Sequence, residues 1–503
     1  MAKDKSQDTL KIFFSPEIFK GSEQDIKPKK RGVMRAEFYS WGAAQEVTGS
    51  KHFLQIKDKI IMVDCGAFQG RREEADSKNR NWPFDAAAVN ALILTHAHYD
   101  HSGLIPVLPQ KGFNGNVYAT PASRDLASLI MMDSAHIQAK DYEFLKKRAR
   151  KKGEFFDKQP LYNEQDVVNS LDYFVTVSYH RHFPVLDGIQ MTFYDAGHIL
   201  GSALAVCEIN LNGQQMKIGF SGDLGRKNLP ILRDPEIIPD VDYLIMESTY
   251  GDRIHDPIET AMNELADVIN RTIERGGKII IPAFAVERTQ ELVYFLHVLR
   301  DQQKITNIPV YVDSPMATNA TSIFRVHQEC YDQETREAFL DHHKNPFGFN
   351  ELRYITNQEE SKELNSLNEP AIIVSSSGMC EAGRILHHLI HNIENPKNTI
   401  LIVGYMAENT LGRKILDRPA EVKIFGDIYK LKAEVISLNT FSAHADYQDI
   451  IDYVSQLNYQ RLKSIFLVHG EKNAQNHLKA LLDDKGYKAV TIQAGQKYTL
   501  QTG

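Results

Sequence analysis

The sequence predicts an α/β fold made of two α/β units, one of which is interrupted by the other. Short segments rich in β-branched and aromatic residues begin at Arg35 and are typical of strands. From about residue 252 the pattern changes to apolar runs that alternate with helices, and after about residue 437 strands and helices mix again. At about 100–200 residues per domain, the 503 residues correspond to about two to four such units.

The first part of the chain, residues 35–251, is expected to contain two groups of strands separated by helices. Residues 1–34 are polar and charged, and we predict a loosely attached tail there. The segments RAEFYSWG, HFLQIKDKIIMVDCG and ALILTH are predicted strands, the second with a turn at Lys57–Asp58. A helical segment covers about 122–172, and strands resume at GIQMTFYDA, ALAVCEINL, QMKIGFSGD and YLIMEST.

Residues 252–437 are expected to form the inserted unit, and residues 438–503 to complete the interrupted one. The segment TAMNELADVINRTIERGG places its large apolar residues on one helical stripe and ends in two glycines. The segments KIIIPAFAV, IPVYVDS, PAIIVSSSG and NTILIVGY are short, nearly continuous apolar runs separated by helices. Such runs are typical of a parallel sheet that is covered on both faces.

The composition excludes a protein that binds polyanions through its overall charge, because 58 basic and 65 acidic residues give a net charge of -7. The four cysteines are too few and too scattered for a disulfide framework or an all-cysteine zinc site, which indicates a reducing compartment. The sequence contains no apolar run typical of a signal peptide and no stretch of about 20 apolar residues. We therefore expect a soluble, cytoplasmic protein without a membrane span.

One local exception to the acidic balance is the basic run KKRARKK at residues 146–152. It falls in the predicted helical segment. We interpret it as a solvated helix face in preference to a nucleic-acid contact, because most charge runs on helices have no other role.

Histidine is the most informative residue type in this sequence. The segment from Leu94 to Gly103, LTHAHYDHSG, places His96, His98, Asp100 and His101 within six positions directly after an apolar strand. Imidazole nitrogens and carboxylate oxygens are ligands that divalent cations prefer. A loop at a strand end can turn alternating side chains toward one point, so this cluster predicts a metal site.

Four single residues share the same setting, a loop of small residues close to a strand end. They are His198 in DAGHILGSA, Asp223 in FSGDLGR, His444 in TFSAHADY and His469 in SIFLVHGE. With His444 set aside for chemistry, five imidazoles and two carboxylates remain, enough for two metal ions with one bridging carboxylate. Two cations about 3.5–4 Å apart can generate a hydroxide and stabilise an in-line displacement at phosphorus.

These motifs, in their order along the chain, resemble those of a known family. HAHYDHSG followed by His198 and Asp223 is similar to the ligand motifs of metallo-β-lactamase-fold hydrolases. Glu247 in MESTYGDR, His444 in FSAHAD and His469 in LVHGE resemble motifs A, B and C of the β-CASP nucleases, which include ribonuclease J and the nuclease subunit of the cleavage and polyadenylation specificity factor. VDSPMA, SSSGMCEAGR and VGYMAENTLGR are similar to segments of the cleavage-factor-like branch. The resemblance covers about residues 35–503 and implies a metallo-β-lactamase αββα sandwich with an inserted parallel-sheet β-CASP cap domain.

The resemblance also implies roles for individual residues. His96, His98 and His198 would bind one zinc ion, Asp100, His101 and His469 would bind a second, and Asp223 would bridge the two. His444 would assist the leaving group beside the scissile phosphate, Glu247 would orient it, and Asp100 would belong to the catalytic group as well as to the metal ligands. Arg288, Arg384 and Arg413, together with Ser375, Ser376 and Ser377, are candidates for gripping phosphates.

The implied activity is that of a zinc-dependent ribonuclease with two zinc ions per chain, hydrolysing phosphodiester bonds of single-stranded RNA through a hydroxide. His469 favours RNA, because family members that process DNA usually lack a histidine at motif C. The 34-residue tail is too short for the N-terminal RNA-binding domains of archaeal members, and ribonuclease J has a further C-terminal domain. We therefore expect a minimal, bacterial-type enzyme, with internal cleavage, 5′-end degradation and a homodimer all left open.

Three other functions remain as alternatives. A hydrolase of small esters or thioesters would leave Glu247, His444 and the large insertion without a use. A non-catalytic scaffold related to degenerate subunits of RNA-processing complexes would have lost ligand residues, whereas every ligand position is filled here. A DNA-directed β-CASP nuclease is disfavoured by His469.

Overall fold

The computed structural model describes residues 33–156, 158–211, 213–255, 257–340, 344–404, 406, 410–438 and 442–502. Residues 34–503 form one compact unit. The predicted tail, apart from its last two residues, lies outside the described residues. Among the described helices, none has the combination of length and apolar character that crossing a membrane requires.

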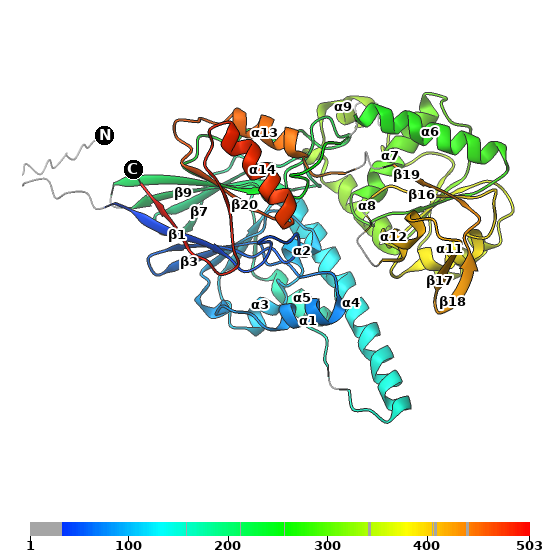
Figure 1. Cartoon of the computed structure of the whole chain (residues 1–503), viewed down its shortest axis with the longest axis horizontal. Helices are drawn as coiled ribbons and strands as arrows, with labels where there is room; N and C mark the ends of the chain where they lie inside the picture. Colours follow the sequence, from blue (N-terminus) through cyan, green and yellow to red (C-terminus); the bar gives the residue numbers. More distant parts are fainter. Residues whose placement is uncertain are drawn as a thin grey trace, which may run out of the picture. The chain divides into compact units, whose positions relative to one another are not determined.

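Two seven-stranded sheets, built from strands in two separate stretches of the chain, form one of the two parts of the fold (Figure 1). The first sheet has the order β22-β1-β2-β3-β4-β5-β6 and the second the order β21-β20-β11-β10-β9-β8-β7. The strands of the first sheet are β1 (Arg35–Ser40), β2 (His52–Ile56), β3 (Lys59–Val63), β4 (Ala91–Ile93), β5 (Asn116–Ala119), β6 (Phe174–Thr176) and β22 (Tyr498–Gln501). Those of the second are β7 (Phe183–Leu186), β8 (Ile189–Asp195), β9 (Ala203–Leu211), β10 (Gln214–Phe220), β11 (Tyr243–Glu247), β20 (Ser464–Val468) and β21 (Ala489–Thr491).

The two sheets pack face to face around a shared apolar core. The ring of Phe38 on β1 lies 5.3 Å from that of Phe466 on β20 and 6.5 Å from that of Phe220 on β10, between centroids. The predicted turn at Lys57–Asp58 joins β2 to β3, as the sequence indicates. Alternate side chains of these strands point into the core, as the period of a strand requires.

Helices cover the outer face of each sheet. The first sheet carries α1 (Arg72–Arg80), a short helix at Ala86–Ala88, α2 (Tyr99–Ser102), α3 (Val107–Gln110), α4 (Pro121–Lys152) and α5 (Glu164–Leu171). The second carries α13 (Tyr447–Ser455) and α14 (Lys472–Asp484). Leu126 and Val167 share a core with the first sheet, and Ile450 and Leu478 share one with the second. The predicted αββα sandwich is therefore confirmed.

The inserted segment contains a six-stranded sheet of order β14-β13-β15-β12-β16-β19, in which all neighbouring strands are parallel. Its strands are β12 (Ile279–Pro282), β13 (Val310–Asp313), β14 (Leu352–Tyr354), β15 (Ile372–Ser375), β16 (Thr399–Ile402) and β19 (Glu434–Ser437). Ile279 and Ile281 face one core and Ile280 the other, so both faces are covered, as predicted.

Helices lie on both sides of this parallel sheet. On the first side lie α6 (Ile258–Glu274), α7 (Arg288–Asp301) and α8 (Pro315–Val326). On the second lie α10 (Gln358–Asn365), α11 (Arg384–Asn392) and α12 (Leu411–Leu416). The remaining short elements are a 3₁₀ helix at Gln328–Cys330, α9 (Gln333–Thr335), a π-helix at Arg336–Leu340, and a hairpin of β17 (Glu421–Ile424) and β18 (Asp427–Lys430).

The insertion interrupts the second sheet of the sandwich between two neighbouring strands. β11 precedes it and β20 follows it, yet the two pair in parallel, with Glu247 opposite Val468. Residues that are more than 200 positions apart along the chain therefore lie side by side at one edge of this sheet.

Candidate metal centre

The candidate ligands come from strand ends that meet at one edge of the sandwich. In the second sheet β8, β10, β11 and β20 run in the same direction, so their carboxyl ends lie along the same edge. His198 follows β8, Asp223 follows β10, Glu247 ends β11 and His469 follows β20. The segment after β4 supplies the remaining ligands from the first sheet, on the loop before α2 and on α2 itself. Polar side chains gather at such an edge because ordered strands hold the backbone while the loops beyond them remain free to bend.

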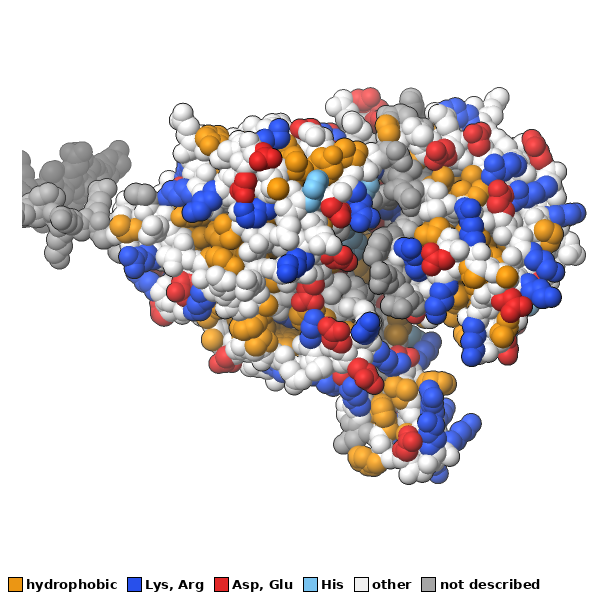
Figure 2. Space-filling model, viewed as in Figure 1, with side chains coloured by type: hydrophobic (Ala, Val, Ile, Leu, Met, Phe, Trp, Pro, Cys, Tyr) orange, Lys and Arg blue, Asp and Glu red, His pale blue; other side chains and the backbone are white. Residues whose placement is uncertain are grey.

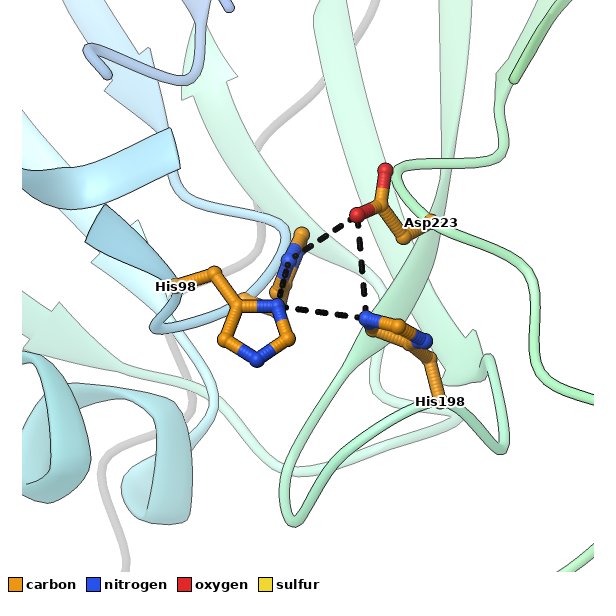
Figure 3. A group of neighbouring side chains, drawn as sticks. His98, His198 and Asp223 are labelled. Carbon is orange, nitrogen blue, oxygen red and sulfur yellow. Dashed lines mark hydrogen bonds and ion pairs between the residues drawn. The ribbon is translucent and has the colours of Figure 1, made fainter. Parts of the chain in front are cut away.

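The first group of donor atoms surrounds His98. Its Nδ1 lies 3.2 Å from Nε2 of His96 and 3.2 Å from Nε2 of His198. Oδ2 of Asp223 lies 3.4 Å from Nε2 of His96 and 3.6 Å from Nε2 of His198. Figure 3 shows His98, His198 and Asp223 pointing toward one another.

The second group faces the other oxygen of the same carboxylate. Oδ1 of Asp223 lies 3.4 Å from Nε2 of His101 and 3.4 Å from Nδ1 of His469. The Nε2 atoms of His101 and His469 are 3.1 Å apart, and Nε2 of His469 is 3.4 Å from Oδ2 of Asp100. Asp223 thus stands between the two groups with one oxygen directed at each.

These spacings fit a bound cation better than a hydrogen-bonded cluster. Two ligands of a tetrahedral zinc ion, each about 2.0–2.2 Å from the metal, lie about 3.3–3.6 Å apart. The Oδ1 atom of Asp223 is buried and accepts no hydrogen bond from the described residues. A buried carboxylate oxygen without a donor is costly unless a positive charge compensates it. The donors of the two groups therefore suit two metal ions.

The protonation of the first group favours the same conclusion. Burial lowers the pKa of His96 to about 3 and that of His98 to about 4, and it holds the pKa of His198 well below its usual value. All three imidazoles are therefore neutral at pH 7, the form in which histidine binds a metal. Burial opposes the charge of Asp223, but the imidazoles of His101 and His469 hold its pKa well below its usual range.

Asp64 and Thr95 are among the polar residues behind the ligands that were not identified in the sequence. Asp64, which follows β3, lies with Oδ2 2.8 Å from Nδ1 of His101, and its Oδ1 accepts a 2.8 Å hydrogen bond from the backbone N–H of Thr95. The hydroxyl of Thr95 lies between the Asp64 carboxylate and Nδ1 of His96. Asp64 adopts a φ of 61°, in the left-handed region, which turns its side chain toward the centre. A carboxylate on the far nitrogen of a histidine fixes the tautomer and orientation of its ring.

Replacement of Asp64 by asparagine is expected to weaken metal binding by about 10- to 100-fold, the usual effect of removing such a partner. Competition with a chromogenic chelator measures the affinity. The exposed turn residue Asp58 provides the control, since Asp58→Asn removes the same charge away from the centre. Equal metal affinity of the two variants would show that Asp64 does not support His101.

His444 lies beside the two groups and is paired with a buried carboxylate. Its Nδ1 is 3.1 Å from Oε1 of Glu247 and 3.8 Å from Oδ2 of Asp223. Burial opposes a positive charge on His444, but the Glu247 carboxylate raises its pKa to about 9. The pairing with Glu247 therefore favours the protonated imidazole, and the side chain of His444 is 20% exposed.

Glu247 is held by groups around it. Its Oε1 accepts a 2.8 Å hydrogen bond from the N–H of Leu224, and its Oε2 accepts a 3.2 Å bond from the N–H of Thr249. The Thr249 hydroxyl donates a 2.5 Å bond to Oε2 and lies 3.0 Å from Nδ1 of His469. Donor atoms of Asp223, Glu247 and His444 also lie within 4.8 Å of one another. Because both Glu247 oxygens already accept hydrogen bonds, this third set suits an oriented imidazolium better than a metal ion.

The structure places the predicted phosphate-binding residues in the inserted part of the chain. The Arg384 guanidinium contacts Asp313, with Nη1 2.6 Å from Oδ1, and donates 2.7 Å to the carbonyl of Thr356. Ser375, Ser376 and Ser377 follow one another at the end of β15 and just beyond it, and their hydroxyls contact, in that order, the carbonyl of Asp313, the hydroxyl of Ser314 and the N–H of Glu381. Arg413, on α12, pairs with Asp417 at 3.0 Å and is about half exposed, while Arg288, on α7, pairs with Glu291. Contact of these residues with substrate stays a prediction.

Comparison with protein-family models finds three consecutive matches. A metallo-beta-lactamase superfamily domain matches residues 53–213, a Beta-Casp domain matches residues 289–415, and a Zn-dependent metallo-hydrolase RNA specificity domain matches residues 428–492. The ligand residues His96, His98 and His198 fall in the first match, and His444 and His469 in the last.

Comparison with curated proteins finds relatives along almost the whole chain. Ribonuclease TTHA0252 of Thermus thermophilus is 34% identical over 91% of this chain and 98% of its own length. The transcription termination factor FttA of Methanocaldococcus jannaschii is 32% identical over 86% of this chain and 66% of its own length. Among solved structures, a protein of unknown function from Enterococcus faecalis V583 matches 93% of this chain and 100% of its own, with a TM-score of 0.53 and 14% identity, which supports the fold alone.

Proposed function

Since the chain belongs to the β-CASP family of metallo-β-lactamase-fold hydrolases, we propose that it is a zinc-dependent ribonuclease that hydrolyses phosphodiester bonds of single-stranded RNA. Residues 35–251 and 438–503 would form the metallo-β-lactamase domain and residues 252–437 the β-CASP domain. The observation that carries the proposal is the position of Asp223, with one oxygen toward each group of histidines and His444 beside it.

The two groups of donor atoms fit two zinc ions. His96, His98 and His198 would hold one ion, and Asp100, His101 and His469 would hold the other, with Asp223 shared. A set rich in imidazole with a minority of carboxylates is one that zinc accepts readily. Zinc held by these residues would lower the pKa of a bound water toward neutral and would offset negative charge at the phosphate.

The residues of the chain itself provide the remaining chemistry. His444 carries a proton, and with Nδ1 directed at Glu247 its Nε2 is the atom that donates to the leaving oxygen. Glu247 favours the charged form of this imidazole and fixes the orientation of its ring. The Glu247 oxygens can do this because they are held in place by backbone N–H groups and by the Thr249 hydroxyl. Proton donation of this kind lowers the barrier, since the leaving oxygen gains negative charge as the bond to phosphorus breaks.

RNA is the proposed substrate because His469 fills the motif C position and because a relative that is matched over 98% of its length is named a ribonuclease. We further propose that the enzyme works in the cytoplasm. Whether it cuts internally, from the 5′ end or both, and whether it forms a homodimer, are separate predictions.

The test is a digestion of 5′-labelled single-stranded RNA beside DNA of the same sequence, with and without a chelator. We expect RNA to be cleaved, DNA to be left largely intact, and chelator to abolish cleavage until zinc is restored. Product lengths distinguish internal cleavage from 5′-end degradation. Cleavage of DNA alone would favour the DNA-directed alternative, and cleavage of neither strand by zinc-loaded protein would overturn the proposal in favour of small esters or thioesters.

A further inference from the structure

The C-terminal half of α4 packs little of its surface against the rest of the described chain. The buried residues of this helix lie mainly between Ala122 and Ala135, and beyond Ala135 only Ala149 is buried. Figure 1 shows this half of α4 continuing past α1 and α5. The exposed side chains of α4 beyond Ala135 can therefore contact a partner.

One face of that half carries basic side chains and an aromatic ring. Lys140, Phe144, Lys147, Arg148 and Lys151 follow one another at spacings of three, four or one, which places them on the same side of the helix. All five are exposed, and Phe144 is 64% exposed. We call these five residues the basic stripe. Figure 2 shows Lys and Arg side chains gathered with hydrophobic ones at this end of the molecule.

Stabilisation of the helix alone does not account for the basic stripe. Basic residues favour the last turn of a helix through its dipole, which explains Arg150, Lys151 and Lys152. The effect falls off within one turn, so it does not explain Lys140 or Lys147. Within the described part of the chain, no carboxylate lies within 4.0 Å of the charged nitrogens of Lys147, Arg148 or Lys151, and Lys140 interacts with Asp133 only at longer range. Like charges four residues apart, such as Lys147 and Lys151, weaken a helix by a few tenths of a kcal/mol.

The helix connects this face to the metal centre. At its start, the hydroxyl of Thr120 donates a 2.6 Å hydrogen bond to the carbonyl of Gly201, three residues after His198. Further along, the hydroxyl of Ser134 donates 3.0 Å to that of Tyr99, the neighbour of Asp100. At about 1.5 Å of rise per residue, Lys147 lies about 40 Å along the helix from Thr120 and about 20 Å from Ser134.

We propose that the basic stripe binds the phosphate backbone of a single-stranded RNA whose scissile bond lies at the metal centre, an inference that rests on the proposed function. Lysine and arginine neutralise successive phosphates, and an exposed ring such as Phe144 offers a face on which a base stacks. Phe155, 91% exposed just beyond the end of α4, adds a second ring. The stripe follows the part of α4 that contacts the metal-centre loops, so an RNA bound at the metal centre must extend along the helix to reach it, and a short RNA does not.

The test compares a 30-nucleotide RNA with a 6-nucleotide RNA in the full-length, zinc-loaded protein. Lys147→Gln, Arg148→Gln and Lys151→Gln are combined in one variant. We expect the ratio of kcat/KM for the long RNA over the short one to fall about tenfold. Binding of the labelled long RNA is measured by anisotropy at 50 and 200 mM salt. Between these concentrations, the factor by which the affinity falls is expected to be about 20 times smaller in the variant than in the unchanged protein. The reason is that three phosphate contacts contribute about 2 to the slope of log affinity against log salt concentration.

A matched control removes three positive charges elsewhere. Lys57, Lys485 and Lys488 are exposed residues on other elements, and their combined change to glutamine is expected to leave both the ratio and the salt dependence unchanged. An equal fall in both variants would overturn the inference and indicate an effect of net charge. Phe144→Ala alone is expected to weaken long-RNA binding severalfold, and circular dichroism checks that α4 remains helical.

The outcomes separate the inference from the proposed function. If the unchanged protein cleaves no RNA, the proposed function fails, and the anisotropy comparison still decides whether the stripe binds RNA. If the long and short RNAs are cleaved with an unchanged ratio and equal salt dependence in all variants, the proposed function stands and the inference is overturned. The stripe variant could instead lose binding to phosphatidylserine vesicles while its RNA binding stays unchanged. That result would overturn the inference in favour of an anionic membrane surface.

Discussion

Replacement of His444 by alanine is expected to lower kcat on single-stranded RNA by about 10²- to 10⁴-fold while the zinc content stays that of the unchanged protein. The loss follows from the position of the imidazole, which pairs with Glu247 at 3.1 Å and lies beside both donor groups rather than within them. Single-turnover rates measure the chemical step, and elemental analysis of the same sample measures zinc.

The surface pair of His180 and Glu236 provides a matched control. Nε2 of His180 lies 2.8 Å from the Glu236 carboxylate, but the imidazole is more than half exposed and takes no part in the centre. His180→Ala is expected to retain full activity. Retained activity in His444→Ala would contradict proton donation by this residue, and loss of zinc together with activity would make it a ligand instead.

Replacement of Asp223 by alanine is expected to abolish the binding of both zinc ions and to lower activity by about 10³-fold or more. The reason is that its two oxygens face different groups of histidines, so its removal takes one ligand from each site at once. Bound metal supplies several kcal/mol of transition-state stabilisation, which corresponds to a rate factor of that size. Elemental analysis after zinc-replete expression is expected to find two zinc ions per chain in the unchanged protein and less than one in the variant.

Asp242 provides the control for the general effect of removing a buried carboxylate from the same sheet. This residue lies just before β11, and its Oδ2 accepts a 2.8 Å hydrogen bond from the N–H of Lys217. Asp242→Ala is expected to lower the stability of the fold and to keep both zinc ions. An Asp223→Ala variant that binds two zinc ions and turns over RNA would contradict the shared carboxylate.

The parallel sheet and the strand-end histidines are predicted from local pattern, whereas the αββα sandwich was implied by the resemblance of the motifs to those of metallo-β-lactamase-fold hydrolases. Apolar period, strand ends and clustered histidines are visible within a few residues. Asp64, Thr95 and Thr249 were missed because their roles depend on the fold, which brings Asp64 to His101 and Thr95 and brings Thr249 to His469. The hairpin of β17 and β18 was also missed; its turn relies on positive φ angles at Phe425 and Gly426, of which only the glycine is a visible signal.

Arg384 illustrates a different limit. An arginine in a segment of small residues suggests a phosphate contact, but the strength of its contact with a neighbouring carboxylate cannot be read from the sequence. In the structure its guanidinium faces Asp313, which also contacts His388 at 2.6 Å, while a contact of Arg384 with substrate stays a prediction. Such ion pairs depend on which strands the fold places side by side.

The parallel pairing of β11 with β20 has a consequence for how the protein is made on the ribosome. At about 5–20 residues per second, the roughly 200 residues between these strands take about 10–40 seconds to synthesise. During that interval β11 has emerged as the outermost strand of an incomplete sheet, with a row of unpaired N–H and C=O groups that another chain can join. His444 and His469 have not yet been translated, so a nascent chain released early holds neither a finished sheet nor a complete set of zinc ligands, and it is a natural client for chaperones.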